Sequence, residues 1–374
     1  MYDVAIVGGG LAGLVNAIHL RKEGFTVLVI ERKTYPFHRV CGEYISNEVV
    51  PYLEALNIFP DELAPASITK FLLTAPSGKG GKLPLDLGGF GVSRYQLDYF
   101  LYQKAVGLGV VFKLGHTVEH VTYHEPCFTL KIRRSNSVQS RMVTGAFGKR
   151  SLLDTRMKRP FTCKEAPFFG VKYHIRYNFP DDTVALHNFE GGYCGLSSVE
   201  GNRYNLCFLG SSRHLQELGS IEAVEEQVLR KNPYLDEIYR EAEFLMDRPQ
   251  VISKVSFQPK LPVENHILMV GDTAGLISPL CGNGMAMAIH AAKIAAEYTA
   301  LFLRNKISRQ EAEARYAANW KQLFVTRLWV GRNTQQLFIN RLSAELAVMM
   351  VRHTRPLARK IMKYTHGQPF TLRE

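Results

Sequence analysis

Residues 1–31, MYDVAIVGGGLAGLVNAIHLRKEGFTVLVIE, decide the fold of this chain. Residues 3–7 are short, apolar and β-branched, which predicts a buried strand. A glycine-rich turn follows, and residues 11–23 then place apolar side chains at helical spacing. A second apolar run, residues 26–30, ends at Glu31. The order predicts a strand–helix–strand unit of a parallel sheet.

The turn in this unit reads G-x-G-x-x-G, with Gly8, Gly10 and Gly13. We expect Gly8 to make the tight turn, Gly10 to let a pyrophosphate approach, and Gly13 to let helix and strand pack closely. The helix start offers N–H groups and a positive dipole end to phosphates. Glu31 is placed to accept hydrogen bonds from ribose hydroxyls, and an acid there disfavours a 2′-phosphate. The unit predicts a site for FAD or NAD rather than NADP, and a glycine turn without a ligand is the alternative.

The composition is that of a globular protein, with 46% hydrophobic and 21% charged residues among 374. A chain of this length has room for two or three domains. We expect no membrane-spanning segment, because no apolar run is long enough, and no signal peptide, because a strand begins at residue 2. The cysteines lack C-x-x-C or metal-type spacing, so we expect free thiols in a reducing cytoplasm.

The net charge of +12 is concentrated near the C-terminus. Residues 301–374 contain 14 Lys and Arg against 4 Asp and Glu. A basic amphipathic region of this kind can lie on an anionic membrane surface or attract an acidic carrier protein, and a solvated helical face is the alternative. No nucleic-acid motif accompanies it, so we expect no nucleic-acid partner. The side chains that form this pattern are Leu346, Met349, Met350, Leu357, Ile361 and Met362 beside Arg352, Arg355, Arg359, Lys360 and Lys363.

Patterning divides the chain into three parts. Alternating strands predict an antiparallel sheet that is solvated or ligand-facing on one side, inserted into a dinucleotide-binding domain. The last part is helical, and Ser308 with Glu311 forms a capping box. The expected divisions are residues 1–67, 92–159 and 258–300 for the dinucleotide-binding domain, 68–91 and 160–257 for the sheet domain, and 301–374 for the helical region.

A second glycine-rich stretch starts at Gly271-Asp272 and continues to Gly282-Asn283-Gly284-Met285. It follows a short apolar strand and leads into a helix rich in small residues. A carboxylate at a strand end can bind the ribityl hydroxyls of a flavin, and a glycine-rich helix start directs N–H groups at an anionic acceptor. A strand–turn–helix packed with small residues is the alternative.

Four motifs in this order resemble the superfamily of FAD-dependent class A flavoprotein monooxygenases and geranylgeranyl reductases: the first glycine turn with Glu31, Arg94 in VSRYQLDYFL, GAFGKRS at residues 145–151, and GDTAGLISPLCGNGMAMA. The resemblance covers residues 1–300. It implies an α/β fold, a Rossmann-like FAD-binding domain with an inserted antiparallel β-sheet substrate domain and a helical C-terminal region. The residues expected at the FAD cofactor are Gly8, Gly10, Leu11, Ala12, Gly13, Glu31, Arg32, Arg39, Arg94, Val118, Gly271, Asp272, Gly282, Asn283, Gly284 and Met285.

The middle motif departs from the family pattern, because Phe147 stands where the family has an acid associated with FAD and nicotinamide binding. The chain also lacks a second G-x-G-x-x-G for a nicotinamide nucleotide. We therefore expect NAD(P)H to reduce the flavin during a transient visit, with another electron source as the alternative.

Two further stretches supply candidate catalytic and substrate residues. The sequence R-x-C-G-E at residues 39–43 resembles the Cys-Gly loop near the flavin in the reductase branch. Cys41 is a candidate proton donor or redox partner, because a basic neighbour lowers a thiol pKa, and an inert cysteine is the alternative. Glu43 is a candidate general acid or a salt-bridge carboxylate. Tyr193 and Cys194 lie in GGYCG, which resembles a substrate-facing strand, and sheet packing is the alternative.

The leading functional hypothesis is an FAD-dependent class A monooxygenase that hydroxylates or epoxidises an apolar, aromatic or polyketide-like small molecule. The second is a geranylgeranyl-reductase-like enzyme that reduces double bonds of an isoprenoid or other lipid. A non-catalytic flavin-binding protein is the third. We expect a cytoplasmic protein, with contact to the membrane surface through the basic helices as an extension of this view.

Overall fold

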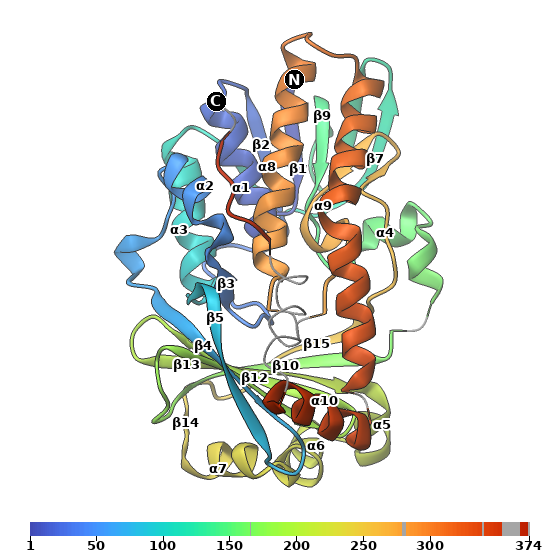
Figure 1. The fold of residues 1–374 in the computed structure, drawn as a ribbon. Coiled ribbons are helices and arrows are strands. Elements are labelled where there is room, and N and C mark those ends of the chain that lie inside the picture. Colours follow the sequence, from blue (N-terminus) through green and yellow to red (C-terminus); the bar gives the residue numbers. More distant parts are fainter. Residues whose placement is uncertain (165, 279–281, 339, 354–366, 373–374) are drawn as a thin grey trace.

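The structure, a computed structural model, describes residues 1–164, 166–278, 282–338, 340–353 and 367–372. These residues form two large sheets, one above the other in Figure 1, and long helices run beside the upper sheet. We call the upper one sheet A and the lower one sheet B. The N-terminus and the last described residues both lie at the end away from sheet B.

Sheet A contains the strand–helix–strand unit that the sequence predicts. Its order is β16-β17-β9-β1-β2-β6, and the pairs from β17 to β6 are parallel. The strands β1 and β2 are buried almost throughout, as apolar runs in parallel sheets are. The strands are β1 (Tyr2–Val7), β2 (Val27–Glu31), β6 (Val111–Leu114), β9 (Val138–Gly145), β16 (Val263–Glu264) and β17 (Ile267–Met269), with the antiparallel extension β7 (Val118–His124) and β8 (Cys127–Ile132).

Helices pack around sheet A and join it to sheet B. The Asn16 amide donates to the Ala292 carbonyl over 2.9 Å and so links α1 to α8. The long α9 runs from the far end of sheet A down to sheet B, where α10 follows it (Figure 1). These helices are α1 (Leu11–Lys22), α2 (Val50–Ala55), α3 (Arg94–Gly107), α4 (Leu152–Arg156), α8 (Gly284–Leu303), α9 (Arg309–Leu337) and α10 (Arg341–His353).

Sheet B has the order β14-β10-β13-β12-β11-β4-β5-β3, with β15 also paired to β10. All its pairs are antiparallel except β11 with β4. Strand β3 pairs with β5 here, although its residues fall in the range expected for the dinucleotide-binding domain. The strands are β3 (Tyr44–Ser46), β4 (Ala66–Thr74), β5 (Gly80–Gly91), β10 (Phe168–Arg176), β11 (Thr183–Phe189), β12 (Gly192–Val199), β13 (Arg203–Ser211), β14 (Glu243–Phe244) and β15 (Gln250–Val255).

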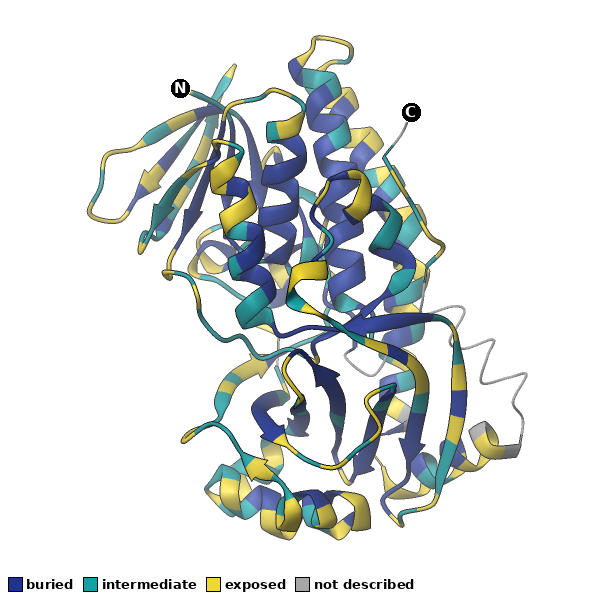
Figure 2. Cartoon of the chain, turned by 90° about the vertical axis from the view of Figure 1, so that its left-hand side faces the viewer, coloured by how far each residue is buried: buried dark blue, intermediate teal, exposed yellow. Residues whose placement is uncertain are grey.

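The two faces of sheet B are covered by different helices. One face packs against α6 (Ile221–Gln227) and α7 (Pro233–Glu241), and the other packs against α10. In Figure 2, the sides of these helices that face sheet B are buried and their outer sides are exposed. A further helix, α5 (Ser212–Leu218), and α7 were not expected from the sequence.

Two helix starts are capped by serines. Ser93 accepts a hydrogen bond from the Gln96 amide and caps α3, which begins at Arg94. Ser308 and Glu311 form the expected capping box at the start of α9. Of the basic amphipathic region, residues 355–363 lie outside the described residues, whereas Leu346, Met349, Met350 and Arg352 lie on α10.

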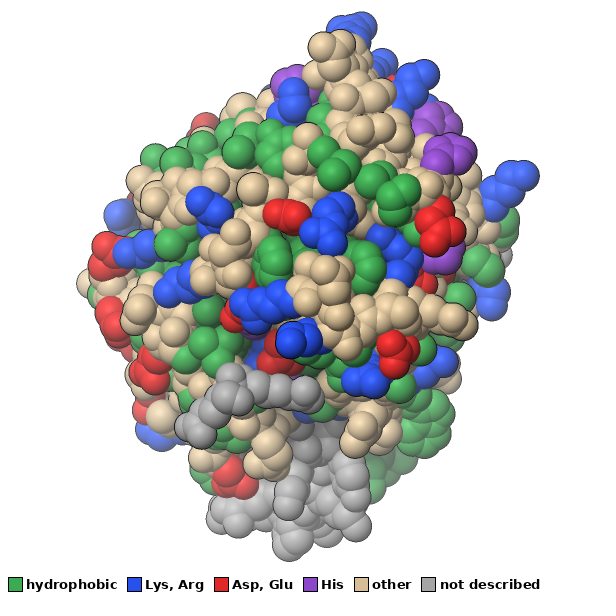
Figure 3. All heavy atoms as spheres, turned by 90° about the horizontal axis from the view of Figure 1, so that it is seen from above, with side chains coloured by type: hydrophobic (Ala, Val, Ile, Leu, Met, Phe, Trp, Pro, Cys, Tyr) green, Lys and Arg blue, Asp and Glu red, His purple; other side chains and the backbone are tan. Residues whose placement is uncertain are grey.

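No helix among the described residues is both long and apolar enough to cross a membrane. On the end of the molecule seen in Figure 3, Lys and Arg side chains are interspersed with Asp and Glu. The described side chains on that face therefore form no broad surface of one charge.

Candidate active site

The first glycine turn is tightly packed at two of its three glycines. Gly8 has a φ of +106°, and a Cβ on it would overlap the Ala146 carbonyl. A Cβ on Gly13 would overlap the Gly8 carbonyl oxygen. Helix α1 thus approaches β1 as closely as the sequence predicts, and a larger residue at Gly13 would separate them.

Gly10, in contrast, would accept a Cβ without overlap and lies against two arginines. The nearest atoms to an added Cβ would be a terminal guanidinium nitrogen of Arg39 and one of Arg94, each 3.7 Å away. Gly10 is the N-cap of α1 and makes no side-chain cap hydrogen bond. The helix start and both guanidinium groups therefore surround one small region, which suits an anionic group such as a pyrophosphate.

The two arginines are held by one buried carboxylate. Arg94 donates through Nε and Nη2 to Asp98 over 2.7 and 2.8 Å, and Arg39 donates through Nε to the same carboxylate over 3.1 Å. Arg39 also lies 3.3 Å from Glu31. The sequence analysis missed Asp98, which looks like any polar position on a helix, although its spacing of four from Arg94 permits the pair.

Glu31 lies at the end of β2, where the sequence places it. Its Oε2 accepts from the Gly9 amide over 2.8 Å and its Oε1 accepts from the Lys33 amide over 3.0 Å. Glu31 therefore fixes the glycine turn, and contact with a ribose stays a prediction. Arg32 beside it is exposed, and Val118 is a buried core residue at the start of β7.

The second motif meets the first in space. Gly271 begins the single-turn helix η5 (Gly271–Thr273), and a Cβ on it would lie 3.1 Å from the Ala12 Cβ and 3.5 Å from the Ala288 Cβ. Asp272 follows and is partly exposed. The start of α1, η5 and α8 thus converge, as one shared cofactor site requires.

The start of α8 completes this region. Gly282 has a φ of +62° and packs on Tyr44, and Asn283 is the N-cap of α8 without a side-chain cap hydrogen bond. Gly284 and Met285 form the first turn. Among the described residues, both helices that the two motifs begin therefore lack side-chain caps, which leaves N–H groups for a ligand.

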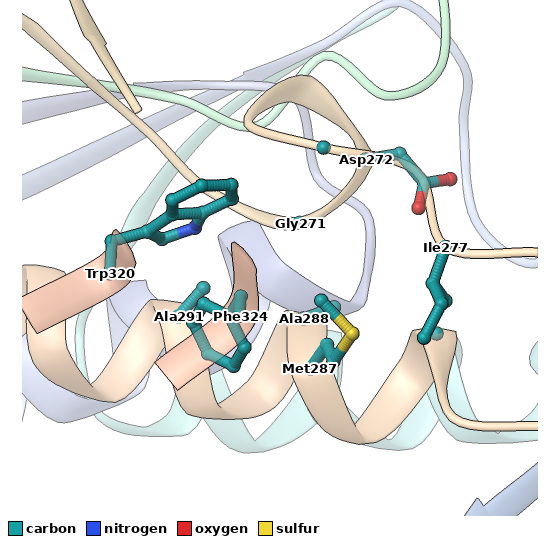
Figure 4. A pocket seen from close by; sticks show the side chains of 10 residues that line it. Gly271, Asp272, Ile277, Met287, Ala288, Ala291, Trp320 and Phe324 are labelled. Carbon is teal, nitrogen blue, oxygen red and sulfur yellow. The ribbon is translucent and has the colours of Figure 1, made fainter. Parts of the chain in front are cut away.

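A small cavity lies behind η5 and the start of α8. Figure 4 shows Asp272 and Ile277 on one side of it and the Trp320 and Phe324 rings on another. The rest of its lining comes from Gly271 and Gly275 and from Gly284, Met287, Ala288 and Ala291 of α8. Asp272 is the charged residue among those that line it.

The middle motif, residues 145–151, contains no acid and instead holds η5 in place. The Gly148 amide donates to the Thr273 hydroxyl over 2.8 Å. Arg159, 1% exposed, donates to the Thr273 carbonyl over 3.0 Å, and Lys260 donates to the Asp272 carbonyl over 2.7 Å. Burial lowers the pKa of Lys260 to about 8. Neither Arg159 nor Lys260 belongs to a recognisable motif, so sequence reasoning missed both.

Glu43 is the centre of a fully enclosed ion cluster. It has a φ of +56° and no exposed surface. Its carboxylate accepts from the ammonium of Lys172, from His174 Nε2 over 2.8 Å, and from the Arg94 amide over 2.7 Å. Burial works to raise the pKa of Glu43, but Lys172 and His174 outweigh it and hold the pKa below its usual value. An ionised, paired carboxylate favours the salt-bridge interpretation over a general acid.

Cys41 lies between the arginine pair and this cluster. Its thiol is free and partly buried, and its carbonyl accepts from the Asn205 amide over 3.1 Å. Burial works to lower the pKa of Arg94, but Asp98, with a further hydrogen bond to the Cys41 thiol, raises it overall. Burial, together with Cys41, raises the pKa of the nearby Cys207 thiol to about 12.

Tyr193 and Cys194 point to opposite faces of sheet B and cannot line one pocket. Tyr193 is 3% exposed and packs in the cluster that includes Leu276 and α10. Cys194 is fully buried in the cluster under α6 and α7, and burial raises its pKa well above the usual value. The face of Tyr193 is largely apolar, with Leu73, Leu186, Leu209 and Val255 from the sheet and Phe338, Ala344, Ala347 and Val348 opposite.

The match to a family model decides the family. Residues 1–317 match the model described as FAD binding domain. This chain belongs to that family. Its members' cofactor fits the residues present here, because the two arginines beside Gly10 and the starts of α1 and α8, which lack side-chain caps, suit the phosphates and flavin of FAD. The chain is an FAD-dependent oxidoreductase.

Individual relatives cover most of this FAD-binding protein. It is 27% identical over 340 residues to digeranylgeranylglycerophospholipid reductase 2 of Methanopyrus kandleri, covering 86% of this chain and 83% of the relative. The solved structure of a geranylgeranyl bacteriochlorophyll reductase-like protein from Thermoplasma acidophilum matches 97% of this chain and 96% of its own, with a TM-score of 0.78 and 19% identity. PqsL, a probable FAD-dependent monooxygenase from Pseudomonas aeruginosa, matches 92% of this chain and 98% of its own, with a TM-score of 0.74 and 17% identity. The structural matches share the predicted fold.

Proposed function

We propose that this FAD-dependent oxidoreductase reduces carbon–carbon double bonds in an isoprenoid or related lipid. The observation that carries the proposal is the match over 86% of the chain to a reductase of a lipid, and the apolar cluster of Tyr193, Leu209 and Leu276 between sheet B and α10 lies beside the second FAD motif. A long hydrocarbon gains free energy from apolar contacts and needs few polar contacts to be recognised. The name of the Methanopyrus relative, a reductase of a lipid, supports this substrate class.

The chain's own residues have defined roles in this proposal. FAD, when bound, supplies the electrons. Arg39 and Arg94 bind its anionic part, and the amides at the start of α8 face the flavin. Cys41 is the proton donor in this proposal, because its thiol lies beside the Arg94 guanidinium, which stabilises the thiolate left after the proton is transferred. Glu43 and Lys172 keep the Cys41 loop in place and exclude water from beneath it.

Hydroxylation or epoxidation of an apolar molecule is the second candidate, because apolar contacts of the same kind also suit an aromatic substrate. The two reactions differ in what the product gains. A reductase adds two hydrogen atoms to each double bond, whereas a monooxygenase adds one atom of molecular oxygen.

Product mass therefore tests the proposal. Reduced enzyme is mixed without oxygen with a geranylgeranyl phospholipid, and the product is analysed by mass spectrometry. Saturation without oxygen supports the reductase. Conversion only when oxygen is admitted, with incorporation of labelled oxygen, contradicts it and supports the monooxygenase. Cys41→Ala should slow the reductase at least about 100-fold if the thiol supplies the proton, and Cys163→Ala, an exposed cysteine, serves as its control.

We also propose NAD(P)H as the electron donor, although Phe147 is partly buried where the family pattern has an acid. Bleaching of the oxidised flavin by NADH or NADPH without oxygen tests this donor directly. A flavin that dithionite bleaches but neither nucleotide does would contradict it.

We also propose that the outer side of α10 contacts a membrane surface. Leu342, Leu346, Met349 and Met350 form one apolar stripe with exposures of 80%, 54%, 49% and 47%, and Arg341 and Arg352 lie at the two ends of the helix. Such a helix can insert its apolar side between anionic headgroups. Flotation with anionic vesicles should recover the protein, and Leu342→Glu with Leu346→Glu should abolish recovery. Equal recovery of both forms would contradict this contact.

A further inference from the structure

A buried carboxylate outside both glycine motifs connects three distant parts of the chain. Glu48 lies on the single-turn helix η1 (Asn47–Val49) and has no exposed surface. Its Oε1 lies 3.5 Å from Asn283 Nδ2 and 3.4 Å from Arg327 Nη1. Asn283 is the N-cap residue of α8, and Arg327 belongs to α9. One carboxylate thus bridges the cofactor region and the long helix.

The third part is the C-terminal stretch of residues 367–372, which we call the strap. The Gly367 amide donates to Glu48 Oε2, and the Phe370 amide donates to the Glu48 carbonyl over 3.2 Å. A Cβ on Gly367 would overlap the Glu48 carboxylate and would lie 2.5 Å from Arg327 Nη2. A larger residue at position 367 would therefore displace the Glu48 carboxylate and the Arg327 guanidinium.

Phe370 holds the strap against α8 a second time. Its ring stacks on His290 with a centroid distance of 3.8 Å and an interplanar angle of 16°. It also contacts the Tyr52 ring of α2 at 5.5 Å. His290 belongs to the same helix as Asn283, so the strap contacts α8 through Glu48 at its start and through Phe370 further along.

The segment that carries Glu48 also supports the turn before α8. Tyr44 lies on β3, shortly before Glu48 in the sequence. A Cβ on Gly282 would lie 3.3 Å from the Tyr44 ring. Gly282 and Asn283 are thus packed from one side by the Tyr44–Glu48 segment, and the strap covers that segment from outside.

We propose that residues 367–372 are part of the FAD site, and that Glu48 is the positioning residue through which they fix the start of α8. The proposal rests on FAD binding and not on the choice of substrate. Amide groups that bind a cofactor act best when the surrounding contacts hold them in place before binding. The strap supplies these contacts without touching the cofactor.

A carboxylate suits this position because its neighbours are all donors. The Asn283 amide, the Arg327 guanidinium and the Gly367 N–H need oxygen acceptors, and an ionised carboxylate has only acceptors. The glutamine isostere would turn an NH₂ group toward at least one of these donors. Glu48→Gln should therefore release the strap while keeping the volume of the side chain.

Binding of FAD to three variants tests the proposal. Glu48→Gln, Gly367→Ala and Phe370→Ala each loosen the strap in a different way. Phe244→Ala is the matched control, since Phe244 is also partly buried and contacts two aromatic rings, Tyr173 and Tyr239, on the far side of sheet B. Flavin-free protein is titrated with FAD well below its melting temperature, and melting is measured separately.

We expect each strap variant to raise the Kd for FAD about tenfold, the range typical of coupling between two sites, while Phe244→Ala changes only the melting temperature. Wild-type affinity in the strap variants with lowered melting temperatures would overturn the proposal, because the strap would then only seal the core. Wild-type protein that binds no FAD would instead overturn cofactor binding itself.

Coupling is reciprocal, which provides a second measurement. FAD should slow the removal of the last residues by a carboxypeptidase in the wild-type protein, and this protection should be lost in Glu48→Gln. Equal rates with and without FAD in the wild type would overturn the proposal even if a variant failed to fold.

Discussion

Two charged clusters flank Cys41. They differ in how many of their hydrogen-bonding groups are already paired within the protein. Around Gly10, Arg39 and Arg94 share Asp98, and the Arg39 side chain is 29% exposed. Around Glu43, the side chains of Glu43 and Lys172 have no exposure at all. A guanidinium has five donors, so the first cluster keeps donors for a ligand, whereas the second is satisfied by the protein. The open cluster can therefore bind a ligand, whereas the closed cluster supports the fold around it.

The largest effect should come from the glycine turn beneath the open cluster. In Gly13→Ala the new methyl group would overlap the Gly8 carbonyl, and neither strand nor helix can move away easily. We expect a loss of stability above about 4 kcal/mol and purified protein without flavin absorbance. Gly107→Ala, where a methyl group meets open space, should remain yellow. A yellow Gly13→Ala protein would contradict the packing described.

Changes in the closed cluster around Glu43 should have the next largest effect, and this effect should be a loss of folding stability. Glu43→Gln leaves the Lys172 ammonium buried without a counter-charge, which costs about 3–5 kcal/mol in unfolding experiments. Adding Lys172→Met should recover much of this loss, because the unpaired charge is then gone. If the single variant unfolds at the wild-type denaturant concentration, the cluster is not the closed support proposed here.

The same pair predicts a pH dependence. Lys172 and His174 hold the pKa of Glu43 below its reference value of 4.5, so its ionised form stabilises the fold. This contribution is complete above the unfolded pKa and is lost as the pH falls through the lower folded pKa. The double variant should therefore lose less stability than the wild type between neutral and acidic pH, measured by urea unfolding. Parallel curves would contradict this assignment.

The open cluster should affect binding more than stability. Arg39→Ala should raise the Kd for FAD about tenfold, because one charge-assisted contact to a phosphate is lost. The effect should shrink at high salt, because the group is partly exposed. Titration of flavin-free protein at two salt concentrations measures both, with Arg213→Ala, an exposed arginine on α5, as the control. A large loss of stability without a change in Kd would make this cluster a support as well.

The smallest effect should come from Cys194, which neither cluster includes. Cys194→Ala should cost about 1 kcal/mol of stability and leave turnover within about twofold, because the side chain lies on the face of sheet B away from the cofactor. Tyr193→Ala, on the other face, should slow turnover. Equal losses of turnover in both variants would contradict the division between the two faces.

The FAD-binding half could be predicted because its signals are local. Gly8, Gly13 and Glu31 act through neighbours within one strand–helix–strand unit, and each residue type has one physical reason to be there. The capping residues Ser93 and Ser308 were predictable for the same reason. The sequence also placed both glycine motifs in one domain, and Gly271 does pack against Ala12.

The sheet half could be predicted only as a set of strands. Lys172 and His174 alternate along β10 as side chains on a solvated or ligand-facing face would, yet they are buried against Glu43. Nothing in the local pattern says which distant carboxylate will meet Lys172. Arg159, which holds η5, is hidden for the same reason, since its partners come from three other segments.

The hairpin of β4 and β5 gives the molecule a fixed internal spacing. At one end β5 pairs with β3, next to Glu48, and at the other the Ser77 amide and hydroxyl donate to Glu345 of α10 over 2.8 and 2.7 Å. The 12 residues of β5 span at most about 40 Å. The hairpin therefore sets the separation between the Glu48 segment and α10, and lengthening it by one pair of residues on each strand would increase that separation by two residue steps.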